Sequence, residues 1–365
     1  MPFLVLCAKG YLSVKVVLSV RIARESQIKY VYLHGLGNNL ANNCVIKKMK
    51  RLLMILALAL HMTGAMAQDD VAFTNYWRFQ SLYNPAAAGR SATLDVNGAF
   101  RMEMLGFENA GNTMLIQGDL PMFFVPKAER HGIGAGFLND KIGLFSNKRM
   151  WLQYAYHHPF GKKNILSIGV KLALVANSFN GADVELGEGS SDEFVPTSDV
   201  NGTGFDMDFG LRYERKDLWY AGISVMHLLS PSVSMGEDKQ FQMKTSPSVY
   251  AMGGYRLRFR QPEFSLRTDA MLQTDLQGWR ADVSGRFCYD GEKGKMYAGL
   301  NYSPTISVAL LLGLTFHGVD IGYSYEMYTG GIAVQNGTHE ISIGYRMELN
   351  LTKKGKNKHQ SVRWL

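Results

Sequence analysis

The amino-acid sequence predicts an all-β fold, a transmembrane antiparallel β-barrel of about fourteen strands. Apolar and polar residues alternate in many segments of roughly 9–13 residues, the pattern of strands with two different faces. The connections between these segments alternate between long and short. No apolar run after residue 67 is long enough for a transmembrane helix, so this chain can enter a membrane only as a closed barrel.

The segment 204–214, GFDMDFGLRYE, shows the alternation most clearly. Phe205 and Tyr213 fall on one face of an extended chain, whereas Asp206 and Asp208 fall on the other. The same pattern recurs in 92–104, 248–259, 263–273, 279–288, 319–326 and 340–349. With weaker segments included, the predicted strands are 92–106, 112–121, 131–140, 148–158, 164–175, 203–214, 217–228, 248–259, 263–274, 278–288, 295–303, 305–316, 318–327 and 338–350.

The main alternative is a soluble sandwich or a lipocalin-like barrel, whose strands also alternate but bury the apolar face inside. Two features favour the membrane barrel. Aromatic residues gather near the strand ends of the apolar face, as in a membrane girdle. The polar face carries glycines and mid-strand charges, and the predicted lumen charges are Asp206, Asp208, Arg256, Arg267, Arg280 and Arg286. These charges fit either a water channel or a closed, ion-paired lumen.

The connections predict which end of the barrel faces outward. The long segments 176–202, 229–247 and 328–337 all follow an odd-numbered strand, whereas tight turns at 214–217 and 316–318 follow even-numbered strands. Outer-membrane barrels have long outer loops and short periplasmic turns. We therefore expect the long loops outside, with 122–130 as a long connection on the periplasmic side.

The N-terminal region is typical of an exported protein. Residues 49–67 combine a basic start, the apolar stretch LLMILALAL and a small-x-small site, which predicts a signal peptide cleaved near Ala67–Gln68. Residues 1–48 are interpreted as an upstream mis-start. The mature chain then divides into an N-terminal periplasmic or plug segment (68–91), the barrel (92–351) and a basic periplasmic tail (352–365).

The charge balance argues against a nucleic-acid partner. The chain has 39 Lys and Arg against 31 Asp and Glu, but residues 1–67 hold nine of these bases and one of these acids. Thirty basic and thirty acidic residues remain, so the excess of positive charge belongs to the leader.

No residue pattern predicts catalysis, a cofactor or a metal site. The sequence has neither G-x-S-x-G nor H-E-x-x-H, and Cys288 is the single cysteine after the leader. His157 and His158 precede a proline at a predicted strand end, where we expect a solvated turn pair. An enzyme therefore has no support from the residues, and no catalytic, cofactor-binding or metal-binding residue is predicted.

Four stretches, in order, resemble the PorP/SprF family of type IX secretion and gliding membrane proteins of Bacteroidetes. They are YNPAAAG (83–89), GIGAGFLNDKIGLFS (132–146), FDMDFGLRYERKDLWYAGISVMHLLSP (205–231) and THEISIGYR (338–346). The residues that match the family motifs are Tyr83, Asn84, Pro85, Ala86, Gly89, Asp140, Gly143, His227, His339 and Glu340. The basic tail after residue 351 departs from many family members, which end soon after the last strand.

The resemblance implies a non-enzymatic outer-membrane barrel without cofactors. Its implied role is to assemble or anchor a secreted surface protein or adhesin. Its implied partners are that protein, a periplasmic peptidoglycan-binding protein and the periplasmic ring components of the secretion system, besides outer-membrane lipid. A porin or small-solute transporter is the alternative function.

Overall fold

The computed structural model describes residues 70–90, 93–122, 130–181, 200–235, 241–292, 294–330 and 336–348. The predicted signal peptide, the upstream segment 1–48 and the basic tail lie outside these ranges. Within the ranges, no helix is long and apolar enough to cross a bilayer.

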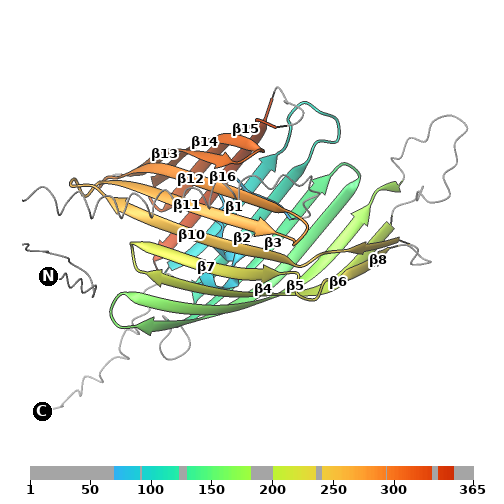
Figure 1. The fold of residues 1–365 in the computed structure, drawn as a ribbon, viewed down its shortest axis with the longest axis horizontal. Helices are drawn as coiled ribbons and strands as arrows, with labels where there is room; N and C mark the ends of the chain where they lie inside the picture. The colour runs from blue at the N-terminus through green and yellow to red at the C-terminus, as the bar shows by residue number, and fades with distance from the viewer. Residues whose placement is uncertain are drawn as a thin grey trace, which may run out of the picture. The chain divides into compact units, whose positions relative to one another are not determined.

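The described chain is almost entirely antiparallel sheet (Figure 1). The strands of the barrel are β1 (Thr93–Met102), β2 (Asn112–Pro121), β3 (His131–Ile142), β4 (Phe145–Phe160), β5 (Asn164–Phe179), β6 (Val200–Arg215), β7 (Trp219–Met226), β10 (Ser248–Arg258), β11 (Phe264–Thr274), β12 (Trp279–Asp290), β13 (Lys295–Ser303), β14 (Ser307–Phe316), β15 (Val319–Tyr328) and β16 (Thr338–Glu348). A separate hairpin consists of β8 (Ser232–Met235) and β9 (Phe241–Lys244).

The fourteen strands close into a barrel in which each pairs with its neighbours in sequence, apart from the inserted β8–β9 hairpin. The first and last strands close it, with Thr93 opposite Glu348 and Met102 opposite His339. Because every strand has a partner on both sides, the sheet has no open edge to leave unsatisfied in lipid. The predicted fold class and strand count are confirmed.

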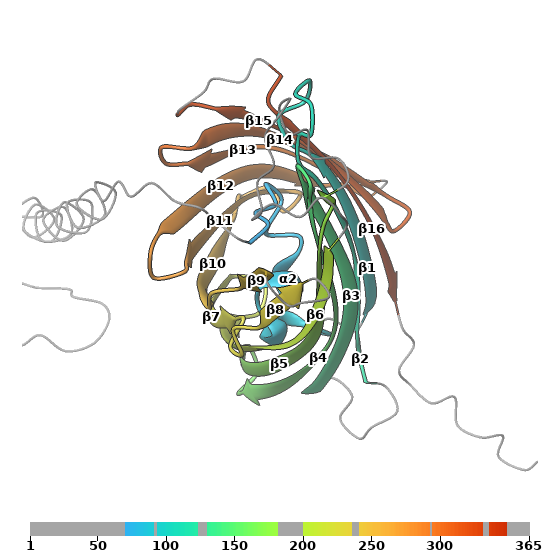
Figure 2. The same cartoon turned by 90° about the vertical axis from the view of Figure 1, so that its right-hand side faces the viewer.

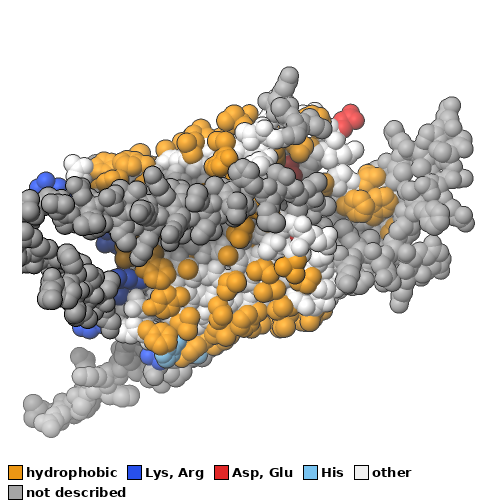
Figure 3. Space-filling model, viewed as in Figure 1, with side chains coloured by type: hydrophobic (Ala, Val, Ile, Leu, Met, Phe, Trp, Pro, Cys, Tyr) orange, Lys and Arg blue, Asp and Glu red, His pale blue; other side chains and the backbone are white. Residues whose placement is uncertain are grey.

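The two faces of the wall separate as the alternation predicts. On β6, Phe205 is 51% exposed, whereas Asp206 and Asp208 are completely buried. On β16, Ile341 and Ile343 are exposed and Glu340 is buried between β15 and β1. Hydrophobic side chains cover much of the visible outer wall (Figure 3). A soluble barrel would bury these side chains, so the observed faces fit a lipid-facing wall.

The two longest connections, 180–199 and 227–247, lie at the same end of the barrel, whereas 122–130 is a long connection at the opposite end. The end that carries 103–111, 180–199, 227–247 and 329–337 is called the loop end, and the end that carries 161–163, 216–218 and 317–318 is called the turn end. β4, β5 and β6 each have 16 residues, more than the ~9–11 that a membrane strand needs, so this part of the wall extends beyond a bilayer. The β8–β9 hairpin within 227–247 is an addition to the predicted loop, and β8 packs beside β5 and β6.

The N-terminal segment lies inside the barrel. Residues 70–90, called the lumen segment, contain a single helical turn α2 (Gln80–Tyr83) and a 3-10 turn η1 (Pro85–Ala87). Figure 2 shows α2 within the ring of strands. The main hydrophobic cluster is formed by the aromatic residues of this segment against inward side chains of the wall, including Tyr250. The core of this protein is therefore the packing between the lumen segment and the wall.

Candidate functional site

The stretch 83–89 is held against β4, β5, β6 and β7 of the wall. Asn84 donates two hydrogen bonds from Nδ2 to the backbone carbonyls of Leu211 (3.0 Å) and Ile223 (3.3 Å), while its Oδ1 accepts one from the amide of Ala86 (2.9 Å). The carbonyl oxygen of Tyr83 accepts a hydrogen bond from Ser224 Oγ (2.6 Å). Pro85 follows at the first position of η1, where its fixed φ and missing N–H are suited to a helix start.

Glycines in the wall make room for this stretch. A Cβ atom added to Gly169 would collide with the backbone of Pro85 and Ala86, and one added to Gly210 would collide with Asn84 Oδ1. Gly89 has a φ of +60°, and a Cβ atom there would collide with Gly132 and Leu120. The glycines on the polar face of the strands are therefore a seat for the lumen segment.

The prediction of a solvated turn pair at His157 and His158 is wrong for His157. Its ring is buried on the inner face of β4, where Nε2 lies 3.0 Å from the carbonyl oxygen of Ala88 and Nδ1 lies 2.8 Å from Ser167 Oγ. β4 continues to Phe160, so the pair is inside a strand, and alternation sends only one histidine inward. His157 contributes to holding the lumen segment.

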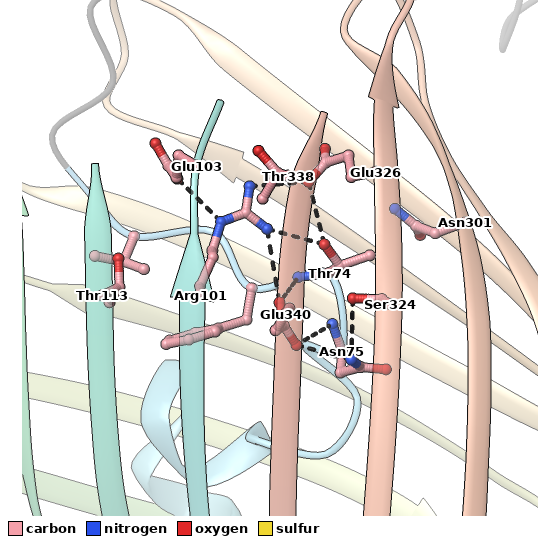
Figure 4. Close-up of polar contacts among 12 residues, drawn as sticks. Thr74, Asn75, Arg101, Glu103, Thr113, Asn301, Ser324, Glu326, Thr338 and Glu340 are labelled. Atoms are coloured by element: carbon pink, nitrogen blue, oxygen red, sulfur yellow. Dashed lines mark hydrogen bonds and ion pairs between the residues drawn. The ribbon is translucent and has the colours of Figure 1, made fainter. Parts of the chain in front are cut away.

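A first buried ion cluster ties the lumen segment to the strands that close the barrel (Figure 4). Arg101 on β1 pairs with Glu326 on β15 (2.8 Å), and Glu340 on β16 lies 3.6 Å from the same guanidinium. Glu340 accepts hydrogen bonds from the amides of Thr74 (2.7 Å) and Asn75 (3.2 Å). Because the charges and the amides of the lumen segment share the same carboxylate, closure of the barrel and seating of the segment are coupled.

A second cluster is formed by residues of β4, β5 and β6, which β2 and β3 separate from β1. Arg149 Nη2 on β4 contacts Asp206 (3.0 Å) and Asp208 (2.7 Å), and Lys171 Nζ lies 3.4 Å from Asp208. Lys171 also donates a hydrogen bond to the carbonyl oxygen of Leu82 in α2. Lys171 thus links this group of four side chains on β4–β6 to the lumen segment.

His227, one residue after β7, completes the second cluster at the loop end. Its Nδ1 lies 2.6 Å from Asp206 and its Nε2 lies 2.8 Å from Asp70, the first described residue of the lumen segment. Burial alone lowers the pKa of His227, but the charge of Asp70 and the hydrogen bonds to Asp206 and Asp70 outweigh it and raise the pKa to about 9. The imidazolium form therefore links the start of the lumen segment to the wall at neutral pH.

The lumen is filled very unequally along its length. A cavity lined by Asp70, Arg149 and His227 has a volume of only about 30 Å³. At the turn end a cavity of about 560 Å³, called the vestibule, lies between the lumen segment and the wall. Its lining includes Trp77, Arg212 and Tyr297, and it reaches the turn residues 215–219.

The predicted lumen arginines divide between these two regions. Arg280 lies toward the loop end and pairs with Asp282 (2.9 Å) and, more distantly, with Glu326 (3.6 Å). The other three line the vestibule: Arg286 pairs with Asp269, and Arg256 and Arg267 both contact Asp290, at 2.7 and 3.4 Å.

One protein family matches most of this chain. The family model described as "Type IX secretion system membrane protein PorP/SprF" matches residues 65–345, which include the lumen segment and almost all of the barrel. The chain belongs to the PorP/SprF family. No curated protein sequence matches it.

Solved structures that resemble this PorP/SprF protein are distant in sequence. The CymD monoaromatic hydrocarbon channel has 12% identity and a TM-score of 0.45 over 74% of this chain and 92% of that one. The Ralstonia pickettii toluene transporter TbuX has 12% identity and a TM-score of 0.44 over 73% and 92%. A Pseudomonas aeruginosa FadL homologue has 12% identity and a TM-score of 0.42 over 73% and 92%.

Three further residues of the predicted motif set lie at the loop end, away from the 83–89 stretch. Asp140 on β3 accepts a hydrogen bond from Thr113 Oγ1 (2.6 Å) and borders the small cavity. Gly143 adopts a φ of +60° in the tight β3–β4 turn. His339 lies beside Tyr323 in the wall, and its Nδ1 is 2.8 Å from the Tyr323 hydroxyl. Its Nε2 lies near the carbonyl oxygen of Asn336, so the ring faces away from the lumen segment that the neighbouring Glu340 binds.

Sequence reasoning missed most of the residues that hold the lumen segment. Arg101 and Lys171 each occupy an inward position between outward apolar neighbours, so the alternation carries the signal that would have found them. Arg149 follows Lys148, so the signal is weaker there. For Asp70, Thr74 and Asn75 the sequence offers no periodicity to read. Their roles depend on contacts with residues far away in the chain, such as Glu340.

Proposed function

We propose that this PorP/SprF protein is a sealed, non-enzymatic outer-membrane barrel of the type IX secretion or gliding apparatus. In this proposal the loop end anchors or assembles a secreted surface protein, and the turn end contacts periplasmic peptidoglycan-binding and secretion-ring components. Export depends on cleavage of the leader near Ala67–Gln68, and lipid surrounds the apolar wall.

The observation that carries the proposal is the use of the family stretch 83–89 to fill the lumen. Asn84, Ala86 and Gly89 fit against wall glycines with no room for a side chain in between. A porin needs an open path from one end to the other, whereas the cavity near Asp70 and His227 is about 30 Å³. When the lumen is filled, only the loops, the rims and the outer wall can bind other molecules. This supports anchoring of a protein over transport of a solute.

The loop end offers the larger scaffold for a surface protein. β5 and β6 continue past β7 at this end, pairing as far as Phe179 and Val200, and the β8–β9 hairpin adds a second sheet beside them. Loops carried on such a rigid scaffold are the usual place for recognition. We therefore assign the surface-protein contact to the segments 176–202 and 229–247.

Deleting the gene separates this function from a porin. We expect one exported protein to disappear from the cell surface, measured by mass spectrometry of surface-shaved peptides, while uptake of small solutes stays unchanged. Reduced uptake with an intact surface proteome would contradict the proposal. A second strain, in which 229–247 is replaced by a Gly-Ser linker of equal length, should give the same loss while the barrel still assembles. Co-purification of the surface protein with a variant that lacks both loops would refute the assignment to the loops.

A further inference from the structure

We propose that the vestibule binds an acidic peptide segment of a periplasmic partner, with its carboxylates held by Arg256, Arg267 and Arg286. These three residues are called the arginine ladder. The inference rests on the proposed function in placing the turn end in the periplasm, and it adds the chemistry by which a partner is recognised there.

The register of three neighbouring strands places the ladder side by side. Arg256 on β10 is directly opposite Arg267 on β11, which is directly opposite Arg286 on β12. All three line the vestibule. Like charges directly opposite each other destabilise a sheet, so three arginines in one row are unfavourable without matching anions.

The carboxylates within reach do not match the ladder one to one. Arg256 and Arg267 contact the same residue, Asp290, and Arg286 pairs with Asp269. Asp269 also accepts a hydrogen bond from the hydroxyl of Tyr220 (2.7 Å). The row therefore retains capacity to bind a further carboxylate.

Two buried arginines on the vestibule have donors that no described residue satisfies. Arg286 is 3% exposed and its Nε has no hydrogen-bond partner among the described residues. Arg212 is 2% exposed, and its Nη2 is likewise without a partner in that part of the chain. Their guanidinium groups are held against aromatic rings, Arg286 3.4 Å from the centroid of Trp77 and Arg212 3.9 Å from that of Tyr220. Both residues line the vestibule, and guanidinium groups held in this way are suited to an anionic ligand.

The vestibule as a whole is positively charged, like the arginine ladder. Ten Lys and Arg residues and seven Asp and Glu residues line it, which leaves an excess of three positive charges. The Lys and Arg side chains in view gather at the left-hand end of Figure 3. The basic segment 352–365 has the same sign as the vestibule, so charge complementarity excludes the chain's own tail as the ligand.

The size of the vestibule favours a peptide over a single small anion. Its volume of about 560 Å³ lies within the ~300–1,000 Å³ of sites that enclose a multi-group ligand. The ladder covers three adjacent strands, which are spaced ~4.8 Å apart. Several carboxylates on one extended chain can contact such a row together, whereas an isolated carboxylate contacts one position at a time.

The test uses the full processed protein in zwitterionic detergent and a fluorescein-labelled hexaglutamate peptide. We expect saturable binding by fluorescence anisotropy, weaker binding at high salt, and none for a labelled hexaglutamine peptide. The double variant Arg256→Gln/Arg267→Gln should weaken binding about tenfold or more, because it removes two charge-assisted contacts. The matched control is Arg258→Gln/Arg260→Gln, which removes the same charge from exposed rim positions that do not line the vestibule, and it should change binding less than about twofold.

Three results would overturn the inference. They are equal binding of the two peptides, equal loss of binding in the ladder and rim variants, and displacement of the labelled peptide by glutarate or inorganic phosphate as effectively as by unlabelled hexaglutamate. The last result would assign the site to small anions. Heat-modifiable migration on gels shows that each variant is folded. If the gene deletion removes a surface protein but hexaglutamate does not bind, only this inference fails; if hexaglutamate binds but the deletion leaves the surface proteome intact, the proposed function fails instead.

Discussion

Toward the loop end, the lumen holds Arg101, Arg149 and Arg280 against the carboxylates of both ion clusters, and about 30 Å³ remains open near His227. Toward the turn end, Arg256 and Arg267 share one carboxylate, and about 560 Å³ is open. Both regions use inward charges on the same kind of strand. This difference indicates that inward charges stabilise the barrel where the lumen segment completes their hydrogen bonds. Where the lumen segment does not reach them, the charges remain available for a ligand.

The largest expected effect comes from removing the lumen segment, which separates the vestibule from the loop end. A variant that lacks residues 70–88 should join the vestibule to the loop end, because fourteen strands enclose a space that wall side chains alone do not fill. Single-channel recordings in planar bilayers should change from no stable openings to porin-like conductance. The full chain is the control, and a correctly folded deletion variant that stays closed would show that the wall itself seals the lumen.

A matched pair of arginine substitutions compares the two regions directly. Arg101→Met should lower the free energy of unfolding by about 3–5 kcal/mol, because Glu340 is left buried without its cation and Glu326 keeps only the more distant Arg280. Arg256→Met makes the same chemical change in the vestibule and should cost less than about 1 kcal/mol, because its side chain is 25% exposed and Asp290 keeps Arg267. Urea unfolding in detergent measures both values. Equal losses would remove the distinction between the regions.

The loop-end cluster should give the protein a pH dependence that the vestibule does not share. The pKa of His227 is raised to about 9 in the folded protein, above ~6.5 in an unfolded chain, so its contribution is fully present below pH ~6.5 and lost as the pH rises through about 9. The expected size is on the order of 3 kcal/mol. Thermal unfolding between pH 6 and 10 should show this loss in the natural protein and not in His227→Gln. The control His339→Gln, on the outer wall, should retain the pH dependence.

The seat of the lumen segment can be tested with two glycines. Gly210→Val should destabilise the protein by about 1–3 kcal/mol, because the new side chain collides with Asn84. Gly285→Val, where an added Cβ meets no atom within 4 Å, should change the free energy of unfolding by less than about 0.5 kcal/mol. Similar losses in both variants would indicate a general intolerance of valine rather than a seat.

The smallest expected effect concerns the ladder itself. Arg267→Gln should leave the free energy of unfolding unchanged or raise it by up to about 1 kcal/mol, because it removes a like charge opposite both Arg256 and Arg286. The gain should shrink at high salt. A clear loss of stability, measured by urea unfolding at low salt, would mean that the ladder is a structural feature.

The sequence alone determined the wall of this protein. Phe205 and Asp206 fall on opposite faces because successive residues of a strand point to opposite sides, and repetition of that rule predicted fourteen strands and an apolar exterior. It also placed Arg256, Arg267, Arg280 and Arg286 on the polar face. The same rule fails for residues 70–90, which have no period and whose single turn α2 forms because the barrel packs around it.

Only the tertiary structure decided which inward residues meet. Glu340 contacts Thr74 across 266 positions of sequence, and His227 contacts Asp70 across 157. Parity along a strand fixes the face of a side chain, but closure of the barrel and the path of the lumen segment fix its partners. In the sequence, the paired charges of the loop end and the arginine ladder look alike, because both are charges on the polar face of strands. Only the position of the lumen segment in the folded barrel distinguishes them.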